Sequence, residues 1–568
     1  MRKTALVITL VAGLLIGGAG GARARDFSLF GAGYGHGLGL SQYGAYGLAQ
    51  KGWSRDGILQ RFYSGTSVAG ATAPPGNIRV GLIQGYASTR VKAVGGSVNV
   101  KLGGVGLPNI TTIPEGETWT IALCGGAYCV KRPNGTQAAK GGSASLHLFL
   151  TYQALGNSVY MYGTSHTYDK GWMEFNIYTP CSGCALDFRV INVVGPQGYL
   201  YGLAEVPSSW PATALQVQAI AARSYAFYKV NTSGQNRAVC NCAVYATTFD
   251  QVYIGADKVS AAFGTNWKAA VDATDNLVVK KDGSVIGAFY HSSSGGHTEH
   301  NENVWGGTPL DYLRGRCDPG DFTESNPNRI WTSSYTGAAI GNLLATYTGT
   351  DIGDATKFTS ITRGVSGRIL STTVNGTNGS VTVSGSTLRS ALGLKDHHVW
   401  INSNKNITGE IRSTYDSRLC APGLPTSVSI NVTGGRYQRF AVGRIYVNYS
   451  LSAAFWVHGA IGDKYVAMGA HTSLLGIPRT GVTAVGATGG VRGIFEGGRI
   501  YSKAATGAHE VHGRVLTVYL SKGGASGSLG YPKTDVVKQA DGKLKSTFEH
   551  GTITCPNSDA GSCTTVFT

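Results

Sequence analysis

The chain has 568 residues and a formal net charge of +17, although only 14% of its residues are charged. It is rich in glycine (83 residues) and tyrosine (29) and poor in methionine (4), a composition that favours turns and strands over long helices. After residue 24 no stretch is long and apolar enough to cross a bilayer, which excludes a multi-span membrane protein. The length predicts about three or four domains, and the positive charge favours anionic partners.

The first 24 residues have the three-part pattern of a secretory signal. Arg2 and Lys3 precede an apolar run over residues 5–16, and residues 22–24 (ARA) offer a cleavage site. A membrane anchor is the alternative, but the apolar run is short for a span. We therefore expect a secreted protein with no stable membrane span, whose charge attracts acidic wall polymers rather than nucleic acid.

Directly behind this signal, residues 33–52 read GYGHGLGLSQYGAYGLAQKG. Glycine is frequent and bulky apolar residues are sparse, so the stretch could be a flexible linker. His36, Ser41 and Gln42 are specific polar side chains, and their presence favours a functional segment instead.

Residues 76–195 contain short alternating segments such as NIRVGLIQ, GSVNVKLGG and FRVINVV, separated by Gly, Pro and Asn. This pattern predicts a run of strands and hairpins. The pattern then changes at VPSSWPATALQVQAIAARSYAFYKV, residues 206–230. Ser208 or Ser209 as N-cap and Pro211 in the first turn predict an alanine-rich helix of about fifteen to eighteen residues.

Glu205 lies just before this predicted helix, among the apolar and aromatic residues Tyr199, Leu200, Tyr201, Leu203, Val206 and Trp210. Burial among such side chains penalises the carboxylate and raises the pKa of Glu205. A carboxylic acid that keeps its proton near neutrality can act as a general acid on a glycosidic oxygen. The alternative is a glutamate that only stabilises the start of the helix.

Later segments supply polar side chains that suit hydrogen bonding to sugar hydroxyls. These candidates are Arg223, Gln251, Tyr253, Ser292 and Ser294. The two serines belong to FYHSSSGGHTEHNENVW, which could equally be a polar surface turn. No Gly-x-Ser-x-Gly elbow precedes them, which argues against a serine nucleophile. Other acidic residues nearby are possible second carboxylates, which we interpret as solvated loop residues: Asp250, Glu299 and Glu302.

Ten cysteines in an exported chain favour disulfides. Three pairs are close enough in sequence to form local bridges: Cys124/Cys129, Cys181/Cys184 and Cys555/Cys563. We expect the remaining four to pair over distance: Cys240, Cys242, Cys317 and Cys420. The alternative is a zinc site, built from the Cys-Asn-Cys pair at 240–242 and the histidines His291, His297 and His300.

From about residue 437 the chain repeats itself. His458 and His512 lie 54 residues apart, and so do Leu475 and Leu529 within LLGIP and SLGYP. Each unit is rich in glycine and has few side chains suited to catalysis, which favours a binding array. The units resemble LGFP repeats over about two and a half copies. That resemblance implies tethering to the cell wall, as on exported proteins of actinobacteria.

Four motifs together resemble the SpoIID/LytB family, which includes the stage II sporulation protein D lytic transglycosylases and amidase enhancers. They are YLYGLAEVPSSWPATALQVQAIAARSYA, DQVYIG, FYHSSSGGHTE and GYGHGLGLSQYGAYGLAQKGWSRDGILQRFYSGT. The resemblance covers residues 27–403 and places the family's catalytic acid on Glu205, in Glu-Val-Pro where the family usually has Glu-Met-Pro. Some members bind zinc, but their ligand spacing does not match Cys240 and Cys242, so we expect no metal and no other cofactor.

In most of the family the His-Gly-x-Gly-x-Ser-Gln segment ends the domain, whereas here it comes first. We therefore expect a circular permutation, in which residues 27–66 fold back beside residues 397–403. In this arrangement His36, Ser41 and Gln42 line the cleft, and the glycines let the backbone approach the glycan.

The expected fold is α+β: a β-rich SpoIID-like catalytic domain with a central alanine-rich helix, an inserted or appended β subdomain, and a β-rich repeat array. The expected boundaries are as follows: a signal peptide at 1–24, the catalytic domain at 25–403, a linker at 404–436 and LGFP-like repeats at 437–568. Within the catalytic domain we separate residues 27–66, the β-rich part at 76–195 and the catalytic core at 196–403.

The resemblance implies a peptidoglycan lytic transglycosylase that is secreted and associated with the wall. Glu205 would protonate the oxygen between N-acetylmuramic acid and N-acetylglucosamine, and its carboxylate would then take the C6 hydroxyl proton as a 1,6-anhydro ring closes. One carboxylate can serve both steps, whereas hydrolysis ordinarily needs two. Expected partners are glycan strands, with anionic or other wall polymers held by the repeats. The alternatives are a non-catalytic wall-binding protein or amidase enhancer, and a zinc-dependent wall hydrolase.

Overall fold

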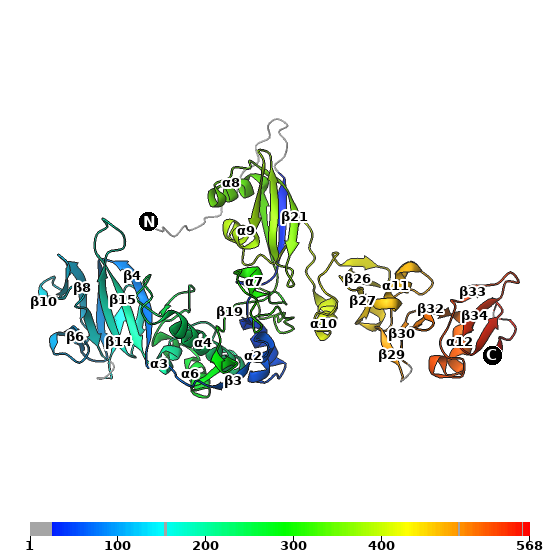
Figure 1. Cartoon of the computed structure of the whole chain (residues 1–568), viewed down its shortest axis with the longest axis horizontal. Coiled ribbons are helices and arrows are strands. Elements are labelled where there is room, and N and C mark those ends of the chain that lie inside the picture. Colours follow the sequence, from blue (N-terminus) through cyan, green and yellow to red (C-terminus); the bar gives the residue numbers. More distant parts are fainter. Residues whose placement is uncertain (1–24, 153–155, 487–488, 559) are drawn as a thin grey trace.

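The computed structural model describes residues 25–152, 156–486, 489–558 and 560–568, so the expected signal peptide lies outside the described residues. The fold is α+β and rich in strands, as expected. A β-sandwich lies at one end, a helical core follows, a small subdomain rises above the core, and the repeats extend to the other end (Figure 1). Within the described ranges, no helix has the length and apolarity needed to span a membrane.

The predicted strands of residues 76–195 form two packed sheets. One has the order β16-β4-β15-β14-β11-β6-β7, and the other has the order β10-β9-β8-β5-β12-β13. Alternate residues such as Val91, Val100 and Leu150 are fully buried in the shared core, as expected for strands that each turn one face inward. The strands are β4 (Ile78–Tyr86), β5 (Ser88–Val94), β6 (Val98–Leu102), β7 (Asn109–Ile113), β8 (Thr118–Cys124), β9 (Ala127–Lys131), β10 (Gln137–Gly141), β11 (Leu148–Thr151), β12 (Ser158–Met161), β13 (His166–Tyr168), β14 (Trp172–Tyr178), β15 (Asp187–Val194) and β16 (Val244–Tyr245).

Helix α4 is the centre of the core and contacts α1, α2, α6 and β17. It runs over Ala212–Ser233, with Pro211 at the N-cap position, so it is longer than predicted and neither Ser208 nor Ser209 caps it. Residues from Ala214 to Phe227 are buried against several neighbours, but the added turn continues through half-buried and exposed residues as far as Gly234, whose φ of +72° ends the helix. The other core elements are β2 (Leu40–Ser41), α1 (Gln42–Gln50), α2 (Arg55–Phe62), β3 (Ser67–Gly70), α3 (Pro196–Tyr201), α5 (Asp257–Ser260), α6 (Gly264–Asp272), β17 (Leu277–Lys281), β18 (Ser284–Val285), β19 (Tyr290–His291) and α7 (Asn301–Val304).

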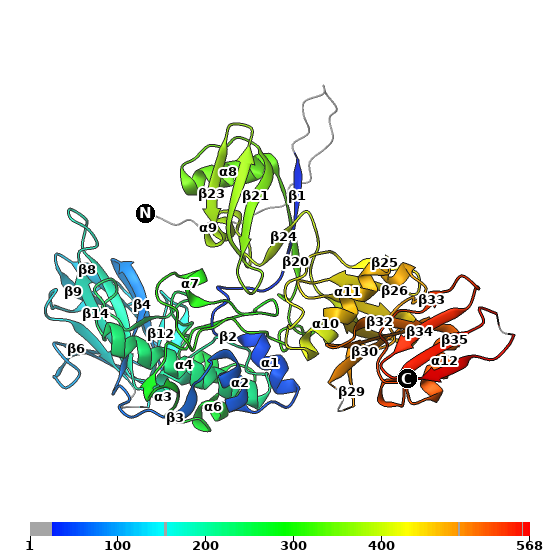
Figure 2. The same ribbon diagram turned by 45° about the vertical axis from the view of Figure 1, so that its right-hand side comes forward.

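Strand β1 (Asp26–Gly31) lies in the middle of a three-stranded sheet, between β20 and β24. Leu29 pairs with Ile401 and Gly31 with Val399. The expected return of the N-terminal segment to residues 397–403 is thereby confirmed, and β1 is seen within the upper subdomain in Figure 2. The rest of this subdomain consists of β20 (Trp331–Thr336), α8 (Gly337–Thr348), β21 (Ala355–Arg363), β22 (Ile369–Gly376), β23 (Ser380–Ser384), α9 (Gly385–Leu392) and β24 (Val399–Ile401).

A buried ion pair joins this subdomain to the core. Arg368 donates to both carboxylate oxygens of Asp396, at 3.0 and 2.7 Å, and both side chains are fully buried. Two further guanidinium N–H groups donate to the carbonyl oxygens of Ser294 and His297, in the loop after β19. Because Arg368 binds Asp396 and two carbonyl oxygens of that loop at once, the pair fixes the position of the loop, which borders the site described below.

The C-terminal region consists of three units, each with one helix and one four-stranded sheet. The same aromatic pair recurs in all three: Tyr415 with Phe440, Tyr465 with Phe495, and Tyr519 with Phe548. The elements are α10 (Gly409–Ser417), β25 (Ile430–Val432), β26 (Gly435–Arg439), β27 (Arg444–Asn448) and β28 (Ala453–Val457), then α11 (Gly459–Ala467), β29 (Thr483–Val485), β30 (Gly490–Ile494), β31 (Gly498–Lys503) and β32 (Gly507–His512), and finally α12 (Gly513–Ser521), β33 (Val537–Lys538), β34 (Leu544–Phe548), β35 (Gly551–Cys555) and β36 (Thr564–Phe567).

The segment expected to be a linker, 404–436, contains α10 and β25 and belongs to the first unit. Its divergent sequence hid the repeat: the Phe-Glu of later units reads Phe440-Ala441 here. In those later units the glutamate has a structural role, since Glu496 accepts from the Ile477 N–H at 3.0 Å and Glu549 from the Tyr531 N–H at 2.8 Å.

All ten cysteines lie within the described residues and form disulfides. The three local bridges that we predicted are present, and Cys317 pairs with Cys420 over 103 residues. Cys240 and Cys242 pair with each other, so the expectation that they pair over distance is wrong. Asn241 between them has φ +51°, and this turn conformation brings the two Cα atoms to 5.1 Å.

Candidate functional site

Glu205 lines a cavity of about 740 Å3 to which loops and helices from distant parts of the chain contribute. The segment after β1 contributes His36, α1 contributes Gln42, and β19 and the loop after it contribute Tyr290 to Ser292. Glu205 itself lies in the short connection between α3 and α4. The cavity therefore joins residues that are more than 160 positions apart in the sequence.

The carboxyl group of Glu205 is largely removed from solvent. Burial raises its pKa above the ordinary value, in the direction expected from the sequence. Opposing this, the Val252 N–H donates to Oε1 at 2.5 Å, and a hydrogen bond from Tyr290 also favours the anion. The result is an acid that keeps its proton to a higher pH than an exposed glutamate but has donors ready for the carboxylate.

A chain of hydrogen bonds leads to this carboxyl group. The Tyr199 hydroxyl donates to Oε1 of Gln251, and Nε2 of Gln251 donates to the Tyr290 hydroxyl, each at 2.8 Å. Because the Tyr290 oxygen accepts from Gln251, its own proton is free to point at Glu205. Gln251 was predicted to bind substrate, but it is fully buried and acts on the site through Tyr290.

Lys258 fixes the backbone beside Glu205. Its Nζ donates to the carbonyl oxygen of Val206 at 2.6 Å, and the side chain is buried. Burial lowers the pKa of Lys258 to about 8, against the opposing effect of the Glu205 charge. Lys258 was not predicted: it lies on α5, three residues after the DQVYIG motif, and no motif includes it.

The glycine-rich segment takes part in the cavity through two of its three polar residues. Gln42 donates to the Glu205 carbonyl oxygen at 3.4 Å, and the His36 ring lies 5.0 Å from that of Trp305. Burial lowers the pKa of His36 to about 4, so the imidazole is neutral near pH 7. Ser41 does not line the cavity: it caps α1 through the Gly44 N–H and donates to Asp321.

The glycines of this segment let the backbone approach the protein itself. A Cβ on Gly39 would lie 2.3 Å from the Phe289 carbonyl oxygen, and one on Gly37 would lie 2.5 Å from the Arg368 guanidinium. Both residues also have positive φ, +63° and +79°. We expected these glycines to let the backbone approach the glycan. In the structure, Gly39 and Gly37 instead let the backbone pack closely against the residue before β19 and against the Arg368–Asp396 ion pair.

The serines after β19 have different surroundings. Ser292 lines the cavity, whereas Ser294 is fully buried and donates to Asp318 at 2.7 Å. Asp318 and Asp321 form a buried acidic pair that receives the hydroxyls of the loop and of Ser41. Burial and the charge of Asp321 raise the pKa of Asp318 to about 7. The pair holds this loop against α1, and it was missed in the sequence because its two residues lie in an unremarkable turn.

Two further predicted binding residues point elsewhere. The Arg223 guanidinium is buried and donates to the carbonyl oxygens of Leu277 and Val271. Tyr253 is buried, stacks on Tyr199 and donates to Asn192 at 2.7 Å. Both residues stabilise the framework behind the cavity, and their predicted contact with substrate has no support in this geometry.

A second carboxylate lines the cavity. Asp250 accepts from the Tyr225 hydroxyl at 2.7 Å and from Arg237 at 2.6 Å, and its side chain is fully buried. Burial by itself raises the pKa of Asp250, but these hydrogen bonds outweigh it and the pKa is lowered. The interpretation of Asp250 as a solvated loop residue is therefore wrong: its carboxylate is buried, and hydrogen bonds from Tyr225 and Arg237 compensate for the loss of water.

Glu299 is also buried rather than solvated, since Ser366 donates to it at 2.5 Å. Of the three acids interpreted as solvated, Glu302 alone keeps partial exposure, paired with Arg314.

Three aromatic rings stand exposed at the cavity. Phe249 is 73% exposed, Trp305 54% and Tyr34 45%. Phe289 packs edge-on against Trp305 and Tyr245 against Phe249, which holds these two rings in place. Exposed rings beside polar groups are typical of sites that bind sugar faces.

The thiolates needed by the zinc alternative are not available. Cys240 and Cys242 are bonded to each other. Another group of potential ligands, Cys317, Asp416 and Cys420, contains two cysteines that are likewise bonded to each other.

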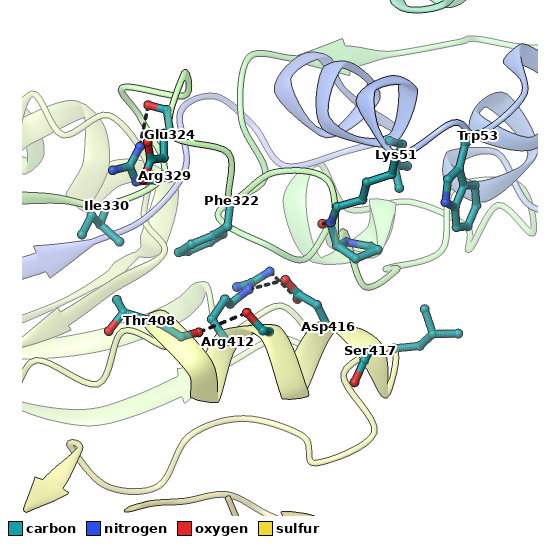
Figure 3. Close-up of a pocket in the computed structure, with 15 residues that line it drawn as sticks. Lys51, Trp53, Phe322, Glu324, Arg329, Ile330, Thr408, Arg412, Asp416 and Ser417 are labelled. Atoms are coloured by element: carbon teal, nitrogen blue, oxygen red, sulfur yellow. Dashed lines mark hydrogen bonds and ion pairs between the residues drawn. The ribbon is translucent and has the colours of Figure 1, made fainter. Parts of the chain in front are cut away.

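A different cavity, of about 720 Å3, lies between α1, the loop after Cys317 and α10 (Figure 3). Its charged side chains are largely occupied: Arg412 pairs with Asp416 at 2.8 Å, and Arg329 donates to backbone carbonyl oxygens. None of its lining residues was predicted as a site residue, and it has no acid in an apolar setting.

Comparison with known proteins identifies two kinds of module. The family model for SpoIID, Stage II sporulation protein, matches residues 186–280, and the model for the LGFP repeat matches residues 423–473 and 475–527. The first match contains Glu205 and the whole of α4.

Three curated relatives were compared. An uncharacterized protein of Brachyspira hyodysenteriae is 33% identical over 162 residues, which is 28% of this chain and 40% of the relative. The amidase enhancer of Bacillus subtilis is 36% identical over 128 residues, 22% of this chain and 15% of the relative. Stage II sporulation protein D of Bacillus subtilis is 26% identical over 220 residues, 37% of this chain and 61% of the relative. The chain thus covers less than two thirds of each of these relatives.

Proposed function

We propose that this chain, which carries a SpoIID domain followed by LGFP repeats, is a peptidoglycan lytic transglycosylase held at the cell wall by its repeats. The observation that carries the proposal is the setting of Glu205: a desolvated carboxyl group, with donors for its anion, at the wall of a large open cavity. This is the setting that a general acid needs to protonate a sugar oxygen.

The cavity suits a glycan substrate. Tyr34, Phe249 and Trp305 offer ring faces for sugars, while Gln42 and Ser292 offer hydrogen bonds to hydroxyl or acetamido groups. Lys229 and Arg389 also line it, and they can attract the carboxylates of muramic acid or of its peptide.

The reaction balances with one carboxyl group. Glu205 gives its proton to the leaving oxygen of N-acetylglucosamine as the bond from that oxygen to the muramyl C1 breaks. The muramyl O6 then bonds to C1, and its proton passes to the Glu205 carboxylate, which restores the acid. No water is consumed. Between the two steps, the Val252 N–H and the Tyr290 hydroxyl stabilise the carboxylate.

Asp250 is the residue that would support hydrolysis instead. It is ionised and lines the same cavity, so a water molecule activated there would give reducing ends rather than anhydro ends. Its oxygens, however, are engaged by Tyr225, Arg237 and the Tyr245 N–H. This engagement favours a supporting role for Asp250 and the transglycosylase reaction for Glu205.

The test is product analysis on purified glycan strands. We expect the wild type to release 1,6-anhydro muropeptides, and Glu205→Gln to lower the rate by about 100-fold to 10,000-fold, the usual contribution of a general acid. Glu324→Gln, at an exposed acid outside the cavity, is the matched control and should keep the wild-type rate. Undiminished release by Glu205→Gln would remove Glu205 from the mechanism, and reducing ends in place of anhydro ends would establish hydrolysis.

The second candidate is a non-catalytic amidase enhancer, favoured by the relative that carries this name. It predicts no glycan product from the wild type, and equal stimulation of a wall amidase by the wild type and Glu205→Gln. The zinc-dependent hydrolase is not proposed, because its two cysteines are joined to each other.

A further inference from the structure

A cavity of about 150 Å3 lies between the strands β26–β28 of the first repeat unit and α11, the helix that begins the second unit. In Figure 1 these elements lie beside one another, to the right of α10. Its lining includes two arginines, Arg439 and Arg444, together with His458. No residue lines both this cavity and the one at Glu205.

The two arginines face each other directly. Arg439 at the end of β26 is the register partner of Arg444 at the start of β27. Like charges opposite each other on paired strands repel and weaken the pairing. Both guanidinium groups lie within 6.0 Å of the centre of the Tyr437 ring, so the two charges share one aromatic neighbour.

Neither arginine has an acidic partner. Their side-chain hydrogen bonds are to the hydroxyls of Tyr437 and Tyr446, at 3.4 and 3.3 Å, and among the described residues neither forms an ion pair. The cavity also lies at the start of α11, where the N-cap residue His458 makes no side-chain cap bond. The positive end of the helix adds to the field of the two guanidinium groups.

Comparison with the equivalent positions of the other repeat units shows which residues of the cavity the repeat fold does not require. The position of Arg444 is Arg499 in the second unit, but the position of Arg439 is Ile494. The second unit also has Glu510 where the first has Trp456, and Glu510 binds His512 at 2.9 Å. The facing arginine pair is thus confined to the first unit, although all three units keep the Tyr-Phe stack.

We propose that this cavity binds an acidic saccharide unit of a wall polymer, with Arg439 and Arg444 on its carboxylate or phosphate. Asp463 is exposed at the cavity and can accept a hydroxyl of the same sugar. The inference rests on the proposed function only in placing the protein at the wall, since it involves no turnover.

The test measures sedimentation with insoluble cell walls, using the full protein in a Glu205→Gln background so that the walls stay intact. Relative to this parent, the Arg439→Gln/Arg444→Gln variant should bind about tenfold more weakly, the loss expected for about 1.4 kcal/mol of charge-assisted contacts. The matched control is Arg499→Gln, which removes the same arginine-tyrosine contact in the second unit and should bind like the parent. Equal binding by the double variant and the parent, or an equal loss in Arg499→Gln, would overturn the proposal.

Competition with small probes identifies the anionic group. N-acetylmuramic acid supplies a carboxylate, N-acetylglucosamine 1-phosphate a phosphate, and N-acetylglucosamine neither. Displacement of the parent by one or both acids but not by the neutral sugar supports the site and names its anion. Displacement by none, or by all three equally, contradicts it. All of these binding assays use the Glu205→Gln background. A negative result therefore contradicts the anion site alone, and the glycan-cleavage assay tests the role of Glu205 independently.

Discussion

Glu205 keeps its proton to a higher pH than an ordinary glutamate because burial removes water from its carboxyl group. In the proposed reaction Glu205 must begin protonated, so the rate should be highest below the raised pKa and should fall as pH rises through it. Tyr290 opposes this shift by donating to the carboxylate.

Tyr290→Phe should therefore move the alkaline limb of the kcat/KM profile to higher pH, because the anion loses a donor and the pKa of Glu205 rises further. The measurement is the rate of anhydro-product release against pH for both proteins. Tyr347→Phe, at an exposed tyrosine, is the control. A limb that stays in place or moves to lower pH would show that Tyr290 does not act on Glu205.

At the scale of single residues, the sequence predicted only some of the residues that line the cavity. Glu205, His36, Gln42 and Ser292 do line one cavity. Arg223 belongs to the same family motif, yet it donates to backbone carbonyls behind the site. A sequence motif contains both residues that support the framework and residues that line the cavity, because both kinds depend on the same local geometry. A single sequence does not show which kind a given residue is.

The alternating glycines at 33–39 act as an element, since they let one segment run against β19 and the Arg368–Asp396 pair. Gly39→Ala should destabilise the protein by more than the roughly 1–2 kcal/mol that a left-handed alanine costs, because its Cβ also meets the Phe289 carbonyl oxygen. Gly52→Ala is the matched control: its φ is +79°, but no atom lies within 4 Å of its Cβ. Thermal unfolding should show a larger loss for Gly39→Ala, and equal losses would mean that the contact relaxes.

Among elements, the strands of residues 76–195 and the helix after Glu205 were predictable from local patterns. Helix α4 was underestimated at its exposed C-terminal end, where it continues through Asn231, Thr232 and Ser233 until Gly234 ends it. α10 was missed altogether, since its signature Tyr415–Phe440 pair becomes visible only once the stack is seen in space.

For the whole molecule, the Cys317–Cys420 disulfide joins the core to the first repeat unit and closes a loop of 103 residues. Replacing both cysteines with serine should cost about 2–5 kcal/mol, because so long a loop gains much freedom when unfolded. The Cys181/Cys184 pair, separated by 3 residues, is the control and should cost less. Similar shifts in Tm for both double variants would contradict this difference.

The position of β1 in the middle of its sheet sets a condition on the order of folding. Residues 26–31 are among the first of the described chain to be synthesised, yet both of their strand partners are made some three hundred residues later. The sheet of the upper subdomain cannot form completely until residue 401 has been synthesised. Until then Phe27 and Leu29 cannot be buried in their native core. Pairing between residues so distant in sequence is intrinsically slow. We therefore expect β1 to stay unpaired while the β-sandwich and the helical core fold.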